Sequence, residues 1–220
     1  MLVLTWNLKH GRAVPSAGHD LFGEFAAAIA GWEWDVALLQ EVPPWWPAPL
    51  AARAQATERH VLTSRNLGLS IRRFVASRWP EVAKSNGGGA NAILVRGASV
   101  LDHRRRRLSL LPERRWVHGV RLDAGLWIWN LHLQGTLDQV LRASAAVLPA
   151  SRPLPVVLGG DFNLRSPSVP GFNHAGGDGV DHVLVRGLAP DGELEVLERG
   201  RLSDHAPLRM ALRPAPTPAP

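Results

Sequence analysis

The sequence predicts an α/β fold in which two sheets pack face to face and helices cover the outside. Early in the chain, short apolar runs alternate with a helical pattern, and later one strand-like run follows another. The chain has 220 residues, of which 45% are hydrophobic and 20% are charged. That composition is typical of a globular protein and supplies enough apolar surface for the core of one large domain.

The first half of the chain is predicted to hold two strands around a helix. Residues 2–8 and 35–40 are compact apolar runs of strand length. Between them Leu21, Phe25 and Ile29 recur four residues apart, which predicts one face of a helix with Asp20 as its N-cap. Residues 43–90 contain prolines and a polar middle and give no clear pattern.

The second half is predicted to be mostly strands. Strands are expected at residues 92–96, 115–122, 126–133, 156–159, 180–186, 193–198 and 206–212. A helix is expected from Thr136, which forms a capping box with Gln139. No linker divides the chain, so we expect a single domain over residues 1–213 and a disordered, proline-rich tail over 214–220.

The stretch VVLGGDFNLRSP combines a core strand, two glycines and two polar side chains. We expect the strand to end at Gly159 and Gly160, which let the backbone turn sharply or let another group approach it closely. Asp161 and Asn163 follow at the exit of the strand.

Charge and cysteine content narrow the classes of function. There is no cysteine, which excludes disulfides and thiolate chemistry. The net charge of +6 comes almost entirely from arginine, which indicates either an anionic partner or simply a GC-rich coding sequence. No apolar run is long enough to span a membrane, and the N-terminus resembles a strand rather than a signal peptide, so we expect a cytoplasmic protein.

Polar side chains interrupt or follow several predicted strands. They are Asn7, Glu41, His132, Asp161, Asn163, Asp181, Asp204 and His205. Each has an ordinary explanation alone: Asp204 as a turn cap, His132 as a core histidine, Glu41 as a solvent-facing acid. Together they offer oxygen and imidazole groups, which suit a hard divalent cation that keeps some of its water.

The segments LTWNL, LLQEV, LHL, GGDFN, VDHVLV and LSDHAPL, in this order, resemble the motif series of the endonuclease/exonuclease/phosphatase superfamily. The resemblance extends from Leu2 to Leu212. It implies the deoxyribonuclease I-like fold, a four-layered α/β/β/α sandwich of two mixed sheets with outer helices. It also implies a site between the sheet edges and hydrolysis of phosphoric esters.

The resemblance assigns the metal and the attacking water to particular residues. Asn7 and Glu41, with Asp204 as a third oxygen donor, are implied to hold Mg²⁺ or, as a substitute, Mn²⁺. Asp161 is implied to orient or deprotonate the water. Asn163 is implied to donate to the phosphoryl oxygens as charge builds up on them.

Further residues are implied to contact the substrate. His205 would contact the phosphate while Asp181 orients its ring, and His132 would protonate the leaving oxygen or stabilise the transition state. Arg115 is a candidate phosphate contact, or merely a strand-end arginine. Asn91, a further candidate for substrate contact, stands roughly where deoxyribonuclease-like members carry a glutamate beside this histidine, so the acid role of His132 is in question.

The expected function is metal-dependent hydrolysis of phosphodiester bonds, with nucleic acid as substrate and a monomeric enzyme. Two alternatives remain open: a phosphatase or phosphodiesterase of the same fold acting on a lipid or inositol phosphate, and a non-catalytic binding protein.

Three further features bear on the substrate. The segment from Asn163 to Asp181 is short, which counts against a repair enzyme that grips and kinks a duplex. The run of arginines at residues 104–107 would track a phosphate backbone or form a solvated strand end. Trp45 and Trp46 would stack on a base, whereas Trp6, Trp127 and Trp129 are expected in the core.

Overall fold

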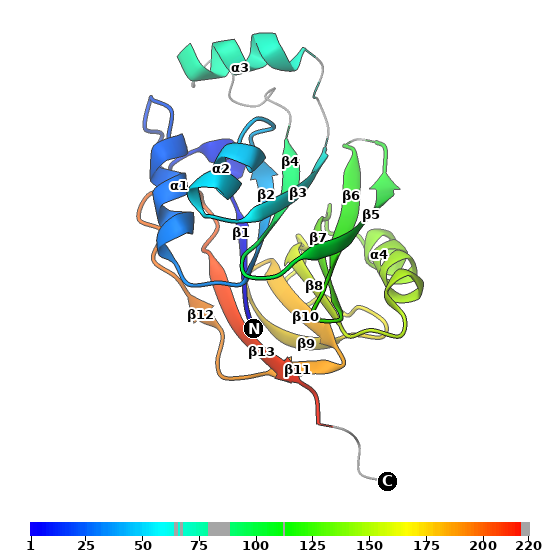
Figure 1. Cartoon of the computed structure of the whole chain (residues 1–220). Helices are drawn as coiled ribbons and strands as arrows, with labels where there is room; N and C mark the ends of the chain where they lie inside the picture. Colours follow the sequence, from blue (N-terminus) through cyan, green and yellow to red (C-terminus); the bar gives the residue numbers. More distant parts are fainter. Residues whose placement is uncertain (64–65, 67, 79–88, 112, 217–220) are drawn as a thin grey trace.

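Two sheets form the centre of the molecule, which was analysed as a computed structural model (Figure 1). The structure describes residues 1–63, 66, 68–78, 89–111 and 113–216. The first sheet has the order β11 (Leu188–Pro190), β13 (Leu208–Pro214), β1 (Leu2–Asn7), β2 (Val36–Val42), β4 (Ala90–Val95) and β3 (Thr57–Leu62), and β12 (Glu195–Val196) also pairs with β13. The second has the order β5 (Val100–Ser109), β6 (Arg115–Leu122), β7 (Leu126–His132), β8 (Val156–Asp161), β10 (Asp181–Arg186) and β9 (Asn173–Asp178).

Each sheet is mixed and contains one parallel pair. β1 runs parallel to β2, and β7 runs parallel to β8, while the remaining neighbours are antiparallel. The parallel strands are buried on both faces, and for that reason they read as nearly continuous apolar runs rather than as alternating patterns.

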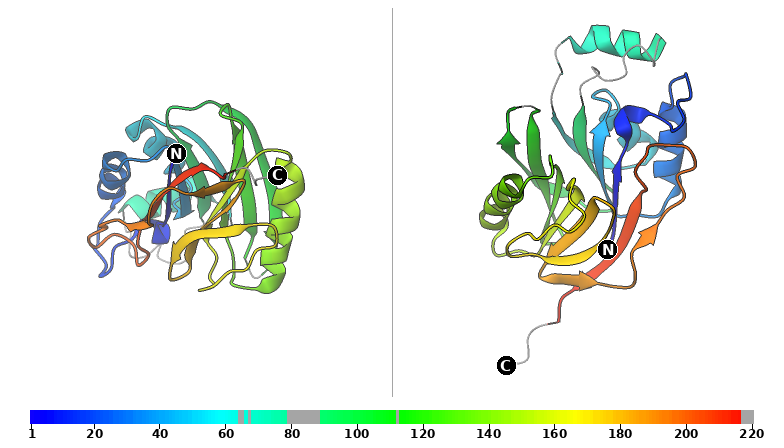
Figure 2. Two further views of the ribbon diagram at one scale, coloured as in Figure 1. Left: turned by 90° about the horizontal axis from the view of Figure 1, so that it is seen from below. Right: turned by 180° about the vertical axis from the view of Figure 1, so that it is seen from behind.

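Helices cover the outer faces of both sheets, so the expected four-layered α/β/β/α sandwich is confirmed (Figure 2). α1 (Phe22–Gly31) and α2 (Pro47–Arg53) pack on the first sheet, and α4 (Leu137–Ser151) packs on the second. A third apolar cluster fills the space between the sheets. A short 3₁₀ helix, η1 (Lys9–Gly11), follows β1, and α3 (Leu69–Arg78) stands beyond the ends of β3 and β4.

The predicted N-cap of α4 is confirmed, whereas the N-cap of α1 is Leu21, without a side-chain cap hydrogen bond, rather than the expected Asp20. The backbone N–H of Phe22 donates to the Asp20 carboxylate at the start of α1 (3.1 Å). At the start of α4, the Thr136 hydroxyl accepts from the backbone N–H of Gln139 (3.4 Å). The Gln139 side chain accepts from the N–H of Gln134 (2.7 Å) rather than from that of Thr136, so only the Thr136 half of the predicted capping box is formed.

The three tryptophans that were expected in the core are found there. Trp6, Trp127 and Trp129 are buried in the two outer cores. The base-stacking role considered for Trp46 is wrong, because its ring is only 4% exposed and packs against Phe22 and Phe25. The ring therefore anchors α2 to α1.

The glycines of VVLGGDFN do not end their strand, which corrects the first expectation for this stretch. β8 continues through Gly159 and Gly160 to Asp161. A side chain at Gly159 would meet Leu38 of the facing sheet, and one at Gly160, where φ is 136°, would collide with the carbonyl oxygen of Leu131. Of the two roles expected for these glycines, a sharp turn or a close approach, the structure shows the second: they let neighbouring backbone and side chains come close to the strand.

Several elements were not predicted or were predicted with other bounds. β3, β5, β9, β11, α2 and α3 were missed, the strand expected at residues 193–198 shrinks to Glu195–Val196, and the last strand extends to Pro214. Of the expected tail, residues 217–220 lie outside the described part of the chain. Within that part, no helix is both long and apolar enough to cross a membrane.

Candidate active site

The carboxyl ends of the two parallel strand pairs meet at one end of the sandwich. Asn7 ends β1, Glu41 lies near the end of β2, and His132 and Asp161 end β7 and β8 in register with each other. The amide of Asn7 donates to Asp161 Oδ2 across the gap between the sheets (2.9 Å). Chain segments far apart in sequence thus form one site, at the end of parallel strands where α/β proteins usually bind ligands.

Asp161 is held rigidly at the centre of this site. Its side chain is 2% exposed, and while Oδ2 accepts from Asn7, Oδ1 accepts from the backbone N–H of Asn163 (2.8 Å). Asn163 adopts a left-handed backbone conformation (φ 51°), and its side-chain amide donates to the carbonyl of Leu133 (2.9 Å). The DFN sequence is therefore a turn that fixes the carboxylate from two sides.

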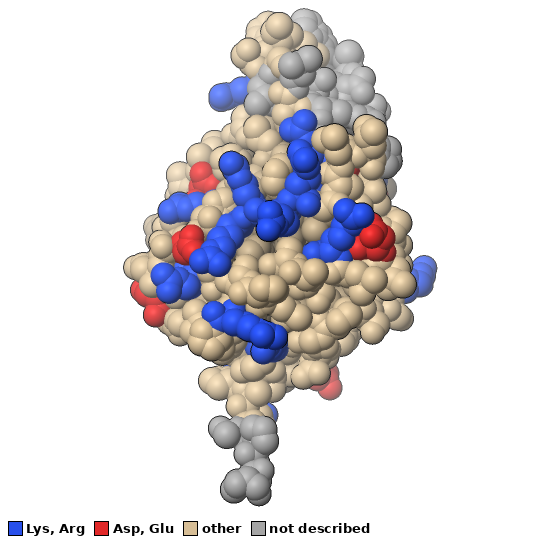
Figure 3. Space-filling model, turned by 90° about the vertical axis from the view of Figure 1, so that its right-hand side faces the viewer, with Lys and Arg blue, Asp and Glu red and all other residues tan. Residues whose placement is uncertain are grey.

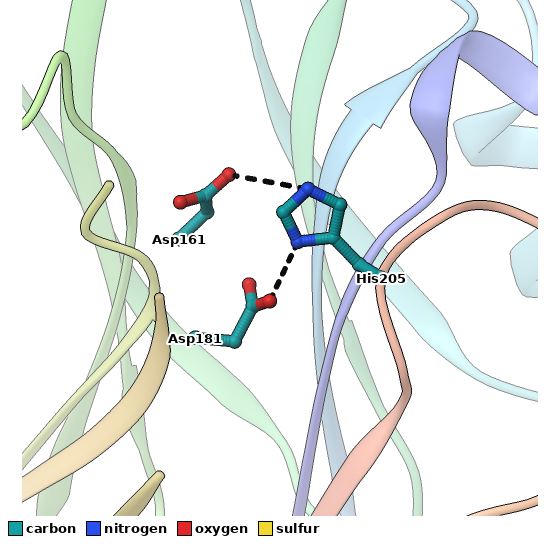
Figure 4. Close-up of side chains that lie close together, drawn as sticks. All are labelled: Asp161, Asp181 and His205. Atoms are coloured by element: carbon teal, nitrogen blue, oxygen red, sulfur yellow. Dashed lines mark hydrogen bonds and ion pairs between the residues drawn. The ribbon is translucent and has the colours of Figure 1, made fainter. Parts of the chain in front are cut away.

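Asp181 and His205 form a close ion pair beside Asp161 (Figure 4). His205 Nδ1 lies 2.6 Å from Asp181 Oδ2, and its Nε2 lies 4.0 Å from Asp161 Oδ2. Burial raises the pKa of Asp181 to about 6, although His205 opposes this change. Burial also opposes the charge on His205, but the hydrogen bond to Asp181 and the neighbouring carboxylates raise its pKa to about 9. Both groups are charged at neutral pH as a result.

His132 lies on the other side of Asp161 and is neutral. Its Nε2 is 3.4 Å from Asp161 Oδ2 and 3.9 Å from Glu41 Oε1. Burial, together with the positive charge of Arg115, holds the pKa of His132 well below 6.5. A neutral imidazole donates a hydrogen bond but is a poor source of a proton, which favours stabilisation over the acid role.

The predicted metal-binding residues lie around the same centre. Asn7 Oδ1 accepts from the backbone N–H of Lys9 (2.9 Å), and Glu41 Oε2 lies 3.2 Å from His10 Nε2. Asp204 forms an ion pair with Lys9. Partial burial of Asp204 opposes ionisation, but the hydrogen bond from Lys9 lowers its pKa, so it is a carboxylate at neutral pH.

Arg115 and Asn91 are less directly connected to this centre. Arg115 is mostly buried and forms a salt bridge with Glu113 (2.7 Å), which neutralises part of its charge. Asn91 is 1% exposed, and within the described part of the chain neither polar atom of its side chain has a hydrogen-bond partner. The structure therefore brings Arg115 near His132 but does not present the amide of Asn91 to solvent.

Some residues of the site were missed in the sequence. Lys9 and His10 hold Asp204 and Glu41, and Ser203 joins two segments by donating to the carbonyl of Asn7 (2.6 Å) and accepting from the N–H of His205 (3.2 Å). Their only signal was proximity in the sequence, since Lys9 and His10 follow Asn7 after Leu8 and Ser203 directly precedes Asp204.

The donor atoms at this end of the sandwich suit a hard divalent cation. Ligand atoms of Asp161, Asp181 and His205 all lie within 4.8 Å of one another, but His205 is protonated at neutral pH, so the carboxylates are the groups of this cluster that suit a cation. Asp181 Oδ1 is buried and has no hydrogen-bond partner among the described residues, and such an atom usually has a protein, water or ion partner. Carboxylate and amide oxygens from Asn7, Glu41 and Asp204 complete a set that fits Mg²⁺ or Mn²⁺.

A two-sheet sandwich with carboxylates, amides and histidines at one end defines a phosphoric ester hydrolase of the deoxyribonuclease I-like fold. The model of the Endonuclease/Exonuclease/phosphatase family matches residues 4–205, and the chain belongs to this family. No curated protein matches the sequence.

Solved structures share the fold at low sequence identity. An endonuclease/exonuclease/phosphatase from Beutenbergia cavernae is 19% identical, with 97% of this chain and 71% of that chain covered and a TM-score of 0.70. A mannosyl-6-phosphatase from Bacteroides thetaiotaomicron is 16% identical, with coverage of 97% and 99% and a TM-score of 0.69. A humanised TDP2 from D. rerio is 16% identical, with coverage of 97% and 98% and a TM-score of 0.63. These likenesses support the fold but do not identify a substrate.

Proposed function

We propose that this protein hydrolyses phosphodiester bonds by in-line attack of a water molecule, with Mg²⁺ or Mn²⁺ as cofactor and nucleic acid as substrate. The observation that carries the proposal is the cluster of Asp161 at the end of β8, Asp181 at the start of β10 and the half-buried His205, which lies beside the carboxyl ends of the parallel strands. In this cluster the fixed carboxylate of Asp161 lies 4.0 Å from the charged imidazole of His205.

Asp161 is the residue that orients and activates the water. Two hydrogen bonds, from Asn7 and from the backbone of Asn163, fix its carboxylate before substrate arrives. A base that is already positioned loses little entropy at the moment of reaction.

The remaining side chains stabilise the charge that develops on the phosphate. His205 is positively charged at neutral pH because, although burial opposes the charge, the hydrogen bond from its Nδ1 to Asp181 raises its pKa to about 9. The Nε2–H of the ring is then available to donate to a phosphoryl oxygen. Neutral His132 donates from the opposite side, and the second amide hydrogen of Asn163 is available to the same oxygens.

Asn7, Glu41 and Asp204 are the proposed metal ligands. A bound divalent cation would supply Lewis-acid stabilisation of the phosphoryl oxygens. Lys9 and His10 hold the carboxylates of Asp204 and Glu41 in place.

Two properties support nucleic acid as the substrate class. The net charge of +6 attracts polyanions, and the site is open to solvent at Glu41, Asp204 and Asn163. The segment between β8 and β9 spans only residues 162–172, which leaves little chain to grip or kink a duplex. We therefore expect little preference for sequence or lesion.

Hydrolysis of bis(p-nitrophenyl) phosphate and of p-nitrophenyl phosphate tests the proposal. We expect the diester to be hydrolysed in Mg²⁺ or Mn²⁺ and the reaction to stop in EDTA. Full activity in EDTA, or activity on the monoester alone, would contradict the diesterase proposal. A panel of single-stranded DNA, duplex DNA, RNA and phosphoinositides then separates nucleic acid from the lipid and inositol alternative.

A further inference from the structure

The four arginines of β5 differ in what they contact. Arg104 has structural partners: it donates to Asp102 (2.9 Å) and to the carbonyl of Ala150 (2.9 Å), and its guanidinium lies 5.0 Å from the centre of the Trp127 ring. Arg105, Arg106 and Arg107 are exposed, and among the described residues no carboxylate forms an ion pair with any of them. Three positive charges are therefore available at the edge of the second sheet.

A hollow of about 600 Å³ lies between these arginines and α4. Arg106, Arg107 and Arg142 line it together with Leu108, alanines and Pro149. Because successive side chains of a strand alternate between its faces, Arg106 brings its charge to the face covered by α4, as Arg104 does, whereas Arg105 and Arg107 bring theirs to the opposite face. Arg142 is paired with Asp138 (2.7 Å), whereas Arg106 and Arg107 form no ion pair with the residues that the structure describes. Figure 3 shows basic side chains gathered on this side of the molecule.

The register of the second sheet connects this surface to the active site. Arg107 pairs with Trp116 on β6, the neighbouring Val117 pairs with Leu131 on β7, and His132 pairs with Asp161 on β8. Arg107 thus lies about three strands from Asp161, which is roughly 14 Å at the usual strand spacing. A substrate chain that occupies the active site needs only a few further units to reach it.

We propose that Arg105, Arg106 and Arg107 bind backbone phosphates of a single-stranded nucleic acid at a distance from the bond being cleaved. The proposal rests on the proposed function and specifies the substrate class of the same active site. Successive side chains of a strand point to opposite faces, so Arg106 points away from Arg105 and Arg107. A flexible single strand of nucleic acid can contact arginines on both faces of the β5 edge, whereas a flat lipid surface can contact those on one face only.

Binding of a fluorescent 20-nucleotide oligo(dT) tests this surface separately from catalysis. The measurement uses the full chain carrying Asp161→Asn, so that the probe is not cleaved. Adding Arg106→Ala and Arg107→Ala should weaken binding severalfold and reduce the slope of log K against log salt by about 1.4, or about 0.7 per lost phosphate contact. Arg106→Lys with Arg107→Lys should keep the slope.

Arg53→Ala with Arg213→Ala is the matched control, because it removes the same charge from α2 and from the end of β13. This control should leave the slope unchanged, and thermal unfolding of each variant verifies the fold. Equal effects of both double variants, or no effect of Arg106→Ala with Arg107→Ala, would overturn the inference.

Two further measurements separate this inference from the proposed function. In the otherwise wild-type protein, Arg106→Ala with Arg107→Ala should leave hydrolysis of bis(p-nitrophenyl) phosphate unchanged, because the small diester does not reach the arginines. Absence of diester hydrolysis would defeat the proposed function, while the oligo(dT) measurement would still decide the binding surface. Loss of binding to phosphatidylserine vesicles, with oligo(dT) binding intact, would instead assign the surface to membranes.

Discussion

At the scale of single residues, the site combines a fixed negative charge on Asp161 with a positive charge on the protonated imidazole of His205. Asp161 is held by hydrogen bonds to Asn7 and to the backbone of Asn163, and His205 is held by Asp181. The contacts with Asn7 and Asp181 join segments distant in sequence, and the contact with Asn163 lies in a left-handed turn.

Asp161→Asn should reduce kcat by a factor of about 10²–10⁴, because the amide cannot activate water. KM should change little or fall, since a negative charge near the phosphate is lost. The new amide also meets the amide of Asn7, so we expect a stability loss of about 1 kcal/mol from the broken hydrogen bond. Steady-state kinetics and urea unfolding measure the two effects.

Asp191→Asn, at an exposed position remote from the site, is the control and should change neither quantity. A near wild-type rate for Asp161→Asn would place the base on another residue.

Asp181→Asn should shift the alkaline limb of the pH–rate profile. In the wild type, His205 keeps its proton until pH rises through about 9, so kcat/KM should fall only above that pH. Without the carboxylate, burial lowers the pKa of His205 toward or below its ordinary value of 6.5, and the variant should lose activity already between pH 6 and 8. Profiles of kcat/KM from pH 5 to 10 measure this shift, and an unchanged limb would show that His205 does not act as a cation.

At the scale of elements, β8 can lie as close to β7 as it does because residue 160 is a glycine. Gly160→Ala should cost about 2–3 kcal/mol or more, because φ of 136° strains any L side chain and the new methyl group collides with the carbonyl of Leu131. Gly23→Ala in α1 is the control, since no atom lies near the added methyl group and alanine favours helix by about 0.5–1 kcal/mol. Urea unfolding measures both changes. Equal stability of the two variants would contradict the role of close packing at β8.

At the scale of the whole molecule, the space between the sheets contains a buried neutral histidine. His118 on β6 is fully buried, and burial followed by the charges of His103 and His60 holds its pKa well below 6.5. Below pH 6.5 the unfolded chain binds a proton at His118 that the folded chain does not, so the free energy of unfolding falls as pH falls.

His118→Asn should therefore weaken the pH dependence of stability. Between pH 7.5 and 5.5 the wild type should lose about 1 kcal/mol more than the variant, the amount expected for one buried neutral histidine. Urea unfolding at the two pH values measures the difference. The buried His132 remains in the variant, so part of the dependence should persist, and identical slopes would show that His118 takes up a proton in the folded state.

The sequence alone predicted elements whose signals are local. The apolar runs of β1, β2, β7 and β10 and the caps of α1 and α4 depend on neighbouring residues, and all of them were predicted to within a few residues. Asn7, Asp161, Asp181 and His205 were recognisable as candidates because polar groups at the ends of core strands are unusual, and because their order resembles a known family.

Tertiary structure decided whatever depends on contacts between distant segments. β5 is an edge strand whose arginines read as a solvated run, and β9 is rich in glycine and polar residues, so neither carries an apolar pattern. Gly160 has a close neighbour only because β7 lies beside β8 in the sheet, and Trp46 is buried because α1 and Gly11 of η1 pack against its ring. The chain by itself thus determined the fold class and the chemical groups of the site. The charge states of His132 and His205 and the availability of Arg105–Arg107 depend on burial and on partners far away in sequence, which only the folded chain brings together.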